Sequence, residues 1–199
     1  IIVQLSLMPG LLLGAISEID PPRAIDAALL AGHTREKIVV AKTSADIDRA
    51  IGRGQLAITD DLNSLVAAGH IDVVIDATGN PNTGTTLALD AIHHGKHVVM
   101  LNVEADITIG RHLKAQAESA GVVYTGAMGD EPACALELIG FAQSLGLKIV
   151  CAGKGKNNPL KFDAVPKEYE AEAKQRNMNA RMLVEFVDGS KTMIEMVAI

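Results

Sequence analysis

The sequence predicts an α/β protein built on a doubly wound parallel sheet, and two observations carry this prediction. Short, continuous apolar segments alternate with segments of helical length along almost the whole chain. Hydrophobic residues make up 48% of the 199 residues and are mostly Ala, Val, Ile and Leu, whereas aromatic residues make up only 3%. Strands that are apolar on both faces are typical of parallel sheets covered by helices.

Each predicted element has a local reason in the sequence. Short apolar runs bounded by turn residues predict strands at 11–17, 37–41, 56–59, 71–77, 97–101, 122–125 and 147–152. Helices are expected at 1–8, 21–32, 45–53, 85–94, 107–120 and 131–145, with one more after residues 60–61. Pro21, Ser44 and Asp106 suit helix starts, and Gly121 and Gly146 suit helix ends.

The pattern changes near residue 150. Residues 153–166 are polar and loop-like, and 167–177 predict a charged helix. A strand at 182–187 and a helix from Thr192 onward are expected to follow. We therefore expect residues 1–150 to form one domain and residues 151–199 to begin a second.

Composition excludes several classes of partner. The net charge of −6, with no cluster of Lys and Arg, argues against a nucleic-acid partner. The sequence contains no run of about 18 apolar residues, so no membrane span is expected. Cys134 in a helix and Cys151 in a strand are expected to be reduced packing residues of a cytoplasmic protein. The chain starts without Met and stops inside an apolar pattern, so we expect both ends to be truncated.

Residues 11–20 predict the second strand of a dinucleotide-binding unit, which ends in an acid. Glu18 or Asp20 would bond the ribose hydroxyls of the cofactor, although an acid in a plain turn is the alternative. Ile19 rather than Arg follows Glu18, which favours NAD over NADP, while Arg23 could reach a 2′-phosphate. The glycine loop of a Rossmann-type unit would precede Ile1, so we expect the first strand and that loop to be missing.

Polar residues and a glycine follow two further predicted strands. Ala77, Thr78 and Gly79 follow the strand at 71–77, and a glycine there lets backbone N–H groups approach a ribose or nicotinamide. Asn102 and Glu104 follow the strand at 97–101. Ligands of open α/β sheets bind at the carboxyl ends of the strands. We expect Ala77, Thr78, Gly79 and Asn102 to contact the cofactor and Glu104 to take part in catalysis.

Two later groups of charged residues are candidates for chemistry. Asp130 and Glu131 lie at a helix start, where carboxylates are common for structural reasons. As a pair they could also move protons or hold Mg²⁺ or Mn²⁺. Lys154 and Lys156 could bind a carboxylate or phosphate, or protonate a developing alkoxide, unless the loop is simply solvated. We expect Asp130, Lys154 and Lys156 to be catalytic.

Segments spread along the chain carry a family resemblance. They are Asp76-Ala-Thr-Gly79, His94-Gly-Lys-His-Val-Val-Met100, Asn102-Val-Glu-Ala-Asp-Ile-Thr-Ile-Gly110, Gly121-Val-Val-Tyr124, Gly129-Asp-Glu-Pro132, Cys151-Ala-Gly-Lys-Gly-Lys-Asn-Asn-Pro-Leu160 and residues 177–193. Together these segments resemble the homoserine-dehydrogenase-like NAD(P)-dependent oxidoreductases that carry a C-terminal SAF domain. Val103 follows Asn102 where homoserine dehydrogenases themselves carry a lysine.

The resemblance implies a function and an assembly. It implies an NAD(P)-binding domain, an α/β domain for substrate binding and dimerisation, and a homodimer. It also implies hydride transfer between NAD or NADP and a small carbonyl or hydroxyl substrate. One alternative is a 1-deoxy-xylulose-phosphate reductoisomerase-like enzyme of isoprenoid synthesis, which would use a divalent metal at Asp130 and Glu131. An alternative of another class is a non-catalytic nucleotide-sensing domain.

Overall fold

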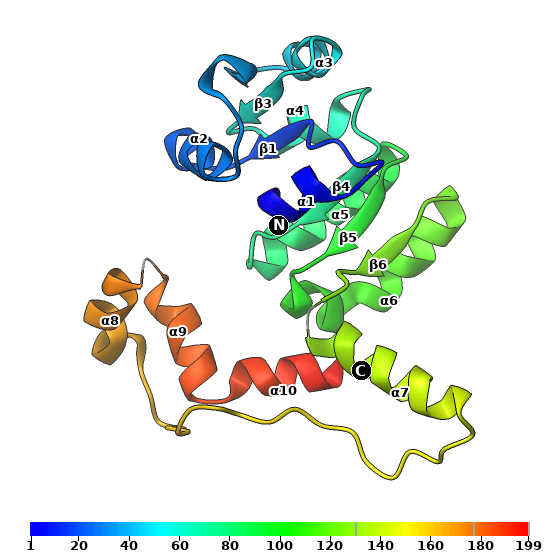
Figure 1. The fold of residues 1–199 in the computed structure, drawn as a ribbon, viewed down its shortest axis with the longest axis vertical. Coiled ribbons are helices and arrows are strands. Elements are labelled where there is room, and N and C mark those ends of the chain that lie inside the picture. The colour runs from blue at the N-terminus through cyan, green and yellow to red at the C-terminus, as the bar shows by residue number, and fades with distance from the viewer. Residues whose placement is uncertain (130, 177, 199) are drawn as a thin grey trace.

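The computed structural model describes residues 1–129, 131–176 and 178–198. It consists of a sheet region, residues 1–127, and a C-terminal region, residues 131–198 (Figure 1). In the described part of the chain, no helix is both long enough and apolar enough to cross a membrane.

The strands of the sheet region pair in parallel throughout and form two sheets of three strands. In spatial order the first sheet contains β1 (Ala15–Ser17), β3 (Leu56–Thr59) and β2 (Ile38–Val40), and the second contains β4 (Val73–Asp76), β5 (His97–Met100) and β6 (Tyr124–Gly126). Ile16 lies opposite Ile58 in the first sheet, and Ile75 lies opposite Val99 in the second. The predicted parallel α/β architecture is therefore confirmed.

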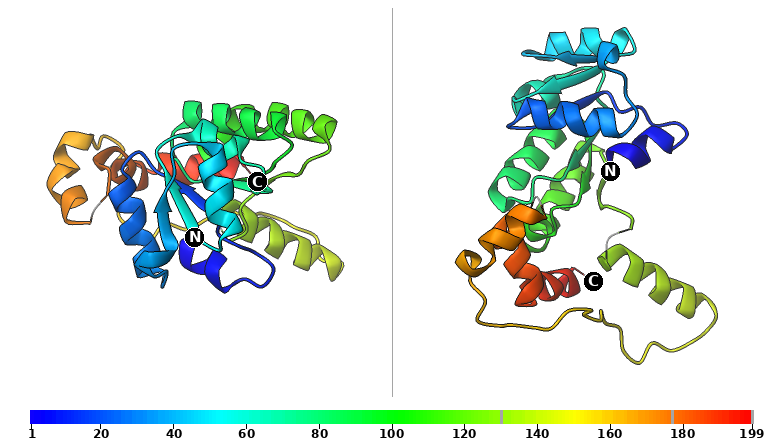
Figure 2. Two further views of the ribbon diagram at one scale, coloured as in Figure 1. Left: turned by 90° about the horizontal axis from the view of Figure 1, so that it is seen from above. Right: turned by 60° about the vertical axis from the view of Figure 1, so that its left-hand side comes forward.

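Helices connect the strands and cover both faces of the sheets. They are α1 (Ile2–Leu7), α2 (Pro21–Leu30), η1 (Arg35–Lys37), α3 (Ser44–Gly52), α4 (Leu62–Ala67), α5 (Pro81–His93) and α6 (Val103–Ala120). Helices α5 and α6 pack against each other and against β5, and α1 lies on the opposite side of the second sheet (Figure 2).

The core follows from the alternation of side chains along β3. Ala57 belongs to a large cluster that also contains Val98, Met100 and Leu113 of the second sheet and α6. Its neighbour Ile58 points to the other face, into a smaller cluster with residues of α2. Because successive residues of a strand face opposite sides, β3 is apolar on both faces, as a doubly wound sheet requires.

The C-terminal region contains helices joined by a long segment without regular structure. The helices are α7 (Glu131–Ser144), η2 (Pro166–Tyr169), α8 (Glu170–Gln175), α9 (Ala180–Val187) and α10 (Ser190–Val197). Helix α10 packs against α9, α7 and α6, so the end of the described chain returns to the carboxyl edge of β5 (Figure 1). The predicted helix at 167–177 is present as η2 and α8.

The strand predicted at 147–152 is wrong. These residues have no regular structure, and Leu147 and Val150 are 59% and 90% exposed. After α7 the chain lies away from β6, and no described strand pairs with this segment to satisfy its backbone hydrogen bonds (Figure 1). Cys151 in this segment and Cys134 in α7 are both exposed, which contradicts the prediction that they are packing residues.

The strand predicted at 182–187 is also wrong, because these residues belong to α9. Asn179 caps the helix by accepting a hydrogen bond from the Arg181 N–H at 2.8 Å. The Arg181 Nε lies 3.1 Å from Glu185 Oε1, one helical turn later. Leu183 and Val184 are buried side by side on one face of the helix. The cap and the apolar face outweigh the preference of Val and Phe for strands.

The predicted start of α6 needs a smaller correction. The helix begins at Val103, and Asn102, not Asp106, is its N-cap. Asp106 lies in the first turn and accepts a hydrogen bond from the Tyr124 hydroxyl at 2.7 Å. Burial, together with this hydrogen bond, raises the pKa of Tyr124 well above its ordinary value.

Candidate functional site

One buried amide ties the carboxyl end of β4 to the start of α6. The Asn102 side chain is almost fully buried, and its Nδ2 lies 3.1 Å from Asp76 Oδ2 and 2.9 Å from the Asn80 carbonyl oxygen. Its Oδ1 accepts a hydrogen bond from the Ala105 N–H at 3.2 Å. The buried Asp76 carboxylate also accepts from the Thr78 N–H at 2.8 Å. The network therefore fixes the loop at 77–80 against the start of α6.

Gly84 allows this network to form. It lies in α5, whose N-cap Asn80 accepts hydrogen bonds from the Asn82 and Thr83 N–H groups. A Cβ at Gly84 would lie 2.2 Å from Asp76 Oδ2 and 2.4 Å from Asn102 Nδ2. The helix can approach the buried carboxylate this closely only because residue 84 has no side chain.

The residues predicted to contact the cofactor at this edge of the sheets differ in their exposure. Ala77, Thr78 and Gly79 are exposed, and Gly79 adopts a left-handed conformation with φ of +65°. No heavy atom lies within 4 Å of the position that a Gly79 Cβ would take, so this backbone is open to a ligand. Asn102 is different, because its amide is used inside the network and its contribution is to hold the loop in place.

Glu18 stands directly after β1, as predicted. Its N–H extends the ladder by donating to the Thr59 carbonyl at 2.9 Å. Its side-chain Oε1 lies 3.4 Å from the Asp20 N–H, and Asp20 itself is exposed. The Glu18 carboxylate is thus half-buried and accessible at the carboxyl end of the first sheet.

Three of the other predicted site residues converge on α10. Lys191 Nζ lies 2.7 Å from Glu104 Oε1, and each side chain is less than one-fifth exposed. Lys154 Nζ lies 2.8 Å from Glu131 Oε1 and is also hydrogen-bonded to Glu195 Oε2. Glu195 is buried, whereas half of the Glu131 side chain is exposed. Two ion-pair groups therefore connect α10 to α6, to α7 and to the loop at 153–158.

The Lys154 group has a defined electrostatic character. Burial opposes the charge of Lys154, but hydrogen bonds to Glu131 and Glu195 outweigh it, so the pKa of the ammonium is raised. The hydrogen bond from Lys154 holds the pKa of Glu131 below its usual range. Lys154 and Glu131 are therefore both ionised at neutral pH.

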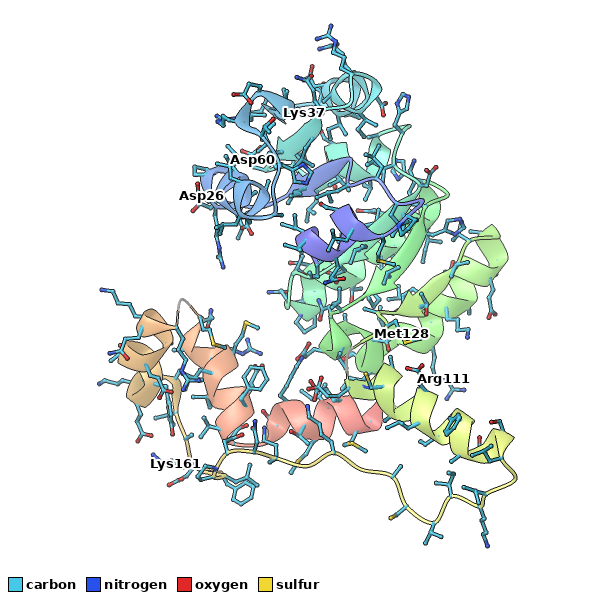
Figure 3. All side chains as sticks on the ribbon, viewed as in Figure 1. Asp26, Lys37, Asp60, Arg111, Met128 and Lys161 are labelled. Atoms are coloured by element: carbon cyan, nitrogen blue, oxygen red, sulfur yellow. The ribbon has the colours of Figure 1, made fainter. Side chains whose placement is uncertain are left out.

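A groove of about 740 Å³ lies beside Lys154. It is lined by residues of α8, α9 and the preceding loop, among them Lys156, Asn157, Asn158, Lys161, Tyr169, Arg176, Leu183 and Phe186. Figure 3 marks Lys161 on this loop, and Met128 at the junction of β6 and α7.

The cations that line the groove differ in their partners. Lys161 lies 2.5 Å from Glu168, and Arg176 lies 2.6 Å from Glu172. Lys156 Nζ lies 5.9 Å from the centre of the Phe186 ring, and no carboxylate among the described residues lies within 4.0 Å of it. Of the described cations that line the groove, Lys156 is therefore one whose charge is not neutralised by a carboxylate and is available to a ligand.

The described residues do not fit the predicted divalent metal. Glu131 is already paired with the ammonium of Lys154, and a second cation beside it would be repelled. Among the described side chains, no group of three or more His, Cys, Asp or Glu is placed to hold a metal ion. Asp130, predicted as a metal ligand and as catalytic, lies outside the described residues.

Sequence reasoning missed Glu195 and the structural use of Asp76, whereas Lys191 was a weaker candidate for the same role as Lys154 and Lys156. Glu195 and Lys191 lie in an apolar helix whose charges carry no motif, and Glu195 is 41 residues from its partner Lys154. The available signal was a carboxylate among the apolar residues that end α10, where an unpaired charge would be costly if buried.

Two family models match the chain. The model described as "Homoserine dehydrogenase, NAD binding domain" matches residues 25–125, and the model described as "Oxidoreductase DRL, catalytic domain" matches residues 129–199. The first therefore runs from within α2 to within β6 and includes the loop at 77–80, and the second covers the C-terminal region with Lys154 and Lys156.

Individual proteins are also similar to this chain. A homoserine dehydrogenase from Methylobacillus glycogenes is 35% identical over 63 residues, which are 32% of this chain and 15% of that protein. A probable dehydrogenase from Thermotoga maritima has a similar structure with a TM-score of 0.51 and 15% identity, over 73% of this chain and 38% of the other. An NAD binding oxidoreductase from Klebsiella pneumoniae gives a TM-score of 0.39 and 24% identity, over 55% and 29%.

These matches bear on the fold and on the family. The likeness to the Thermotoga maritima structure agrees with the Rossmann-type fold. This chain spans well under half the length of each of the three proteins. The NAD-binding model covers just over half of this chain, from residue 25 to residue 125. The chain therefore belongs to the family of homoserine dehydrogenase NAD-binding domains.

Proposed function

We propose that the chain is the cofactor-binding part, and the start of the substrate-binding part, of an NAD(P)-dependent oxidoreductase acting on a small carbonyl or hydroxyl compound. The observation that carries the proposal is the NAD-binding family match over a parallel sheet whose open loop at 77–80 lies at the carboxyl edge. When bound, the nicotinamide would supply or accept the hydride, and the protein would supply orientation and protons.

At the cofactor end, each residue has a distinct task. The exposed backbone of Thr78 and Gly79 would lie along the dinucleotide. The buried amide of Asn102 would hold that loop in place through its hydrogen bonds to Thr78 and Asn80. Glu18 would accept hydrogen bonds from the adenosine ribose hydroxyls, since its carboxylate is accessible after β1. A carboxylate in this position would repel a 2′-phosphate, which favours NAD over NADP.

At the substrate end, Lys154 and Lys156 would have different roles. Lys156, which has no carboxylate partner among the described residues, would bind an anionic group of the substrate. Lys154 would donate a hydrogen bond to the reacting oxygen, because two of its three N–H donors are used on Glu131 and Glu195 and one is left. Homoserine, which carries both a hydroxyl and a carboxylate, is the substrate that we propose to test first.

Cofactor binding tests the first half of the proposal. Titration of the protein with NADH and with NADPH, followed by nicotinamide fluorescence, should show binding that favours NADH. Glu18→Gln should weaken NADH binding by about tenfold, which corresponds to loss of a charge-assisted hydrogen bond of about 1.4 kcal/mol. Glu36→Gln, an exposed acid of η1, is the matched control and should leave binding unchanged.

Turnover tests the second half. The whole protein should reduce NAD in the presence of homoserine, and Lys156→Ala should raise KM for the amino acid more than it lowers kcat. Binding of NADH without turnover on any small hydroxyl or carbonyl compound would favour a nucleotide-sensing domain. Absence of binding to either nicotinamide nucleotide would refute the proposal.

A further inference from the structure

Glu195 is a buried acid to which the proposed reaction assigns no contact with cofactor or substrate. It is 4% exposed, and its carboxylate contacts the ammonium of Lys154 across a separation of 41 residues. Removing a carboxylate from water is costly unless a cation or several hydrogen bonds compensate it. Glu195 therefore constrains where Lys154 can be.

The two carboxylates that hold Lys154 differ in how firmly they are fixed. The Glu131 side chain is 51% exposed, so it can exchange its ammonium contact for water at little cost. The Glu195 side chain is only 5% exposed and lies on α10, which packs against α6, α7 and α9. A substrate oxygen could displace the first contact more easily than the second.

Helix α10 is itself anchored to the cofactor-binding sheet. Lys191, one turn before Glu195, pairs with Glu104 in the first turn of α6, and that turn directly follows β5. Helix α10 therefore fixes the Glu195 carboxylate, and with it the ammonium of Lys154, relative to the carboxyl edge of the sheet. Among the described residues, Glu131 on α7 also pairs with Lys154, and Lys156 lies on the same loop.

We propose that Glu195 is the positioning residue of Lys154: its buried carboxylate holds the ammonium at the groove, with one N–H donor directed to the substrate. This proposal rests on the proposed function for the role of Lys154, and it assigns to Glu195 no contact with the substrate. The ion pair orients a donor that would otherwise sit on a flexible four-carbon side chain in a loop.

The first test measures Lys154 directly and needs no substrate. In the unmodified protein the paired ammonium of Lys154, whose side chain is 20% exposed, should react slowly with acetic anhydride relative to Lys42, whose side chain is 66% exposed. Glu195→Gln should speed acetylation of Lys154, followed by mass spectrometry of its peptide at one pH, by about tenfold. Thr192→Val is the matched control, because it alters the same helix at a hydroxyl without a partner among the described residues.

The second test asks whether positioning matters for the reaction. Glu195→Gln should lower kcat at least about tenfold with little change in KM, because Lys156 still binds the substrate. Glu195→Asp keeps the charge but shortens the side chain, so it should recover only part of kcat. Full recovery by Glu195→Asp would show that charge alone matters and would overturn positioning.

The outcomes separate the two proposals. If the unmodified protein has no turnover but Glu195→Gln still speeds acetylation of Lys154, the proposed function is refuted, whereas the ion pair between Glu195 and Lys154 is supported. If acetylation of Lys154 changes by less than about twofold in a variant with unchanged circular dichroism, the positioning role is refuted. If Glu195→Gln does not fold, the same comparison is made with Glu195→Asp, which should then speed acetylation.

Discussion

The sheet region and the C-terminal region are stabilised by different interactions. In the sheet region, α-helices on both faces bury two clusters of Ala, Val, Ile, Leu and Met side chains. In the described part of the C-terminal region, the buried apolar side chains are Pro132, Ala173, Leu183 and Val184. Its long-range contacts depend instead on ion pairs such as those of Lys154 and Lys191.

The difference matters because the two kinds of interaction have different strengths. Burial of apolar area contributes about 25 cal/mol per Å², and it accumulates with every side chain of a core. Ion pairs contribute less than about 1 kcal/mol each where they are exposed, and they depend strongly on geometry where they are buried. The proposed cofactor edge is thus built on the more stable region, whereas Lys154 beside the groove is held by ion pairs with Glu131 and Glu195.

The largest expected effect contrasts one leucine from each region. Leu113 of α6 is fully buried, whereas Leu138 of α7 is 69% exposed. Leu113→Ala should lower the free energy of unfolding by about 2–5 kcal/mol, because it leaves a cavity in the main cluster. Leu138→Ala should change the same quantity by less than about 0.5 kcal/mol. Urea denaturation followed by circular dichroism measures both, and equal effects would contradict the division into two regions.

A second contrast uses two helical glycines. Gly84→Ala should destabilise the protein by about 2–4 kcal/mol, because the new Cβ displaces the Asp76 carboxylate or the Asn102 amide from buried hydrogen bonds. Gly140→Ala in α7 is the matched control, since nothing lies within 4 Å of its Cβ position. This control should stabilise α7 by up to about 1 kcal/mol, as alanine favours a helix over glycine. Thermal denaturation of both variants measures the difference, and a neutral Gly84→Ala would show that the network can shift.

Much of the sheet region could be predicted from sequence, because its signals are local. The strands at 56–59 and 97–101 are short apolar runs with glycines or acids beside them, and each lies within a residue of its predicted place. The polar residues after the strands at 71–77 and 97–101 predicted a ligand edge. The burial of Asn102 could not be predicted, because it depends on Asp76, 26 residues away, and on how closely α5 approaches at Gly84.

The C-terminal region was harder to predict for the same physical reason. Residues 147–152 have the composition of a buried strand, but a strand forms only where a neighbouring edge is free. Helix α9 did carry local signals, the cap at Asn179 and the Arg181–Glu185 spacing, which the β-branched residues obscured. The ion pairs of Lys154 with Glu195 and of Lys191 with Glu104 join residues far apart in sequence, so no local spacing predicts them.

The smallest expected effect is a pH dependence at one acid of the sheet region. Asp48 in α3 accepts hydrogen bonds from the Gly69 and His70 N–H groups at 3.0 and 2.8 Å, and it thereby fixes the loop after α4. Burial opposes the charge of Asp48, but these hydrogen bonds outweigh it, so its pKa lies below the ordinary value of 3.8. A lowered folded pKa gives stability that is fully present above the unfolded pKa and is lost as the pH falls through the folded value.

Asp48→Asn should therefore destabilise the protein by less than about 1 kcal/mol at pH 7, and the difference from the unmodified protein should shrink at pH 3. Urea denaturation at the two pH values measures this. Asp26→Asn is the control, because Asp26 is an exposed acid of α2 (Figure 3) and should show no difference at either pH. A deficit of Asp48→Asn that is as large at pH 3 as at pH 7 would mean that the amide disturbs the loop sterically. The carboxylate charge would then contribute nothing to this part of the sheet region, which would leave apolar burial as its source of stability.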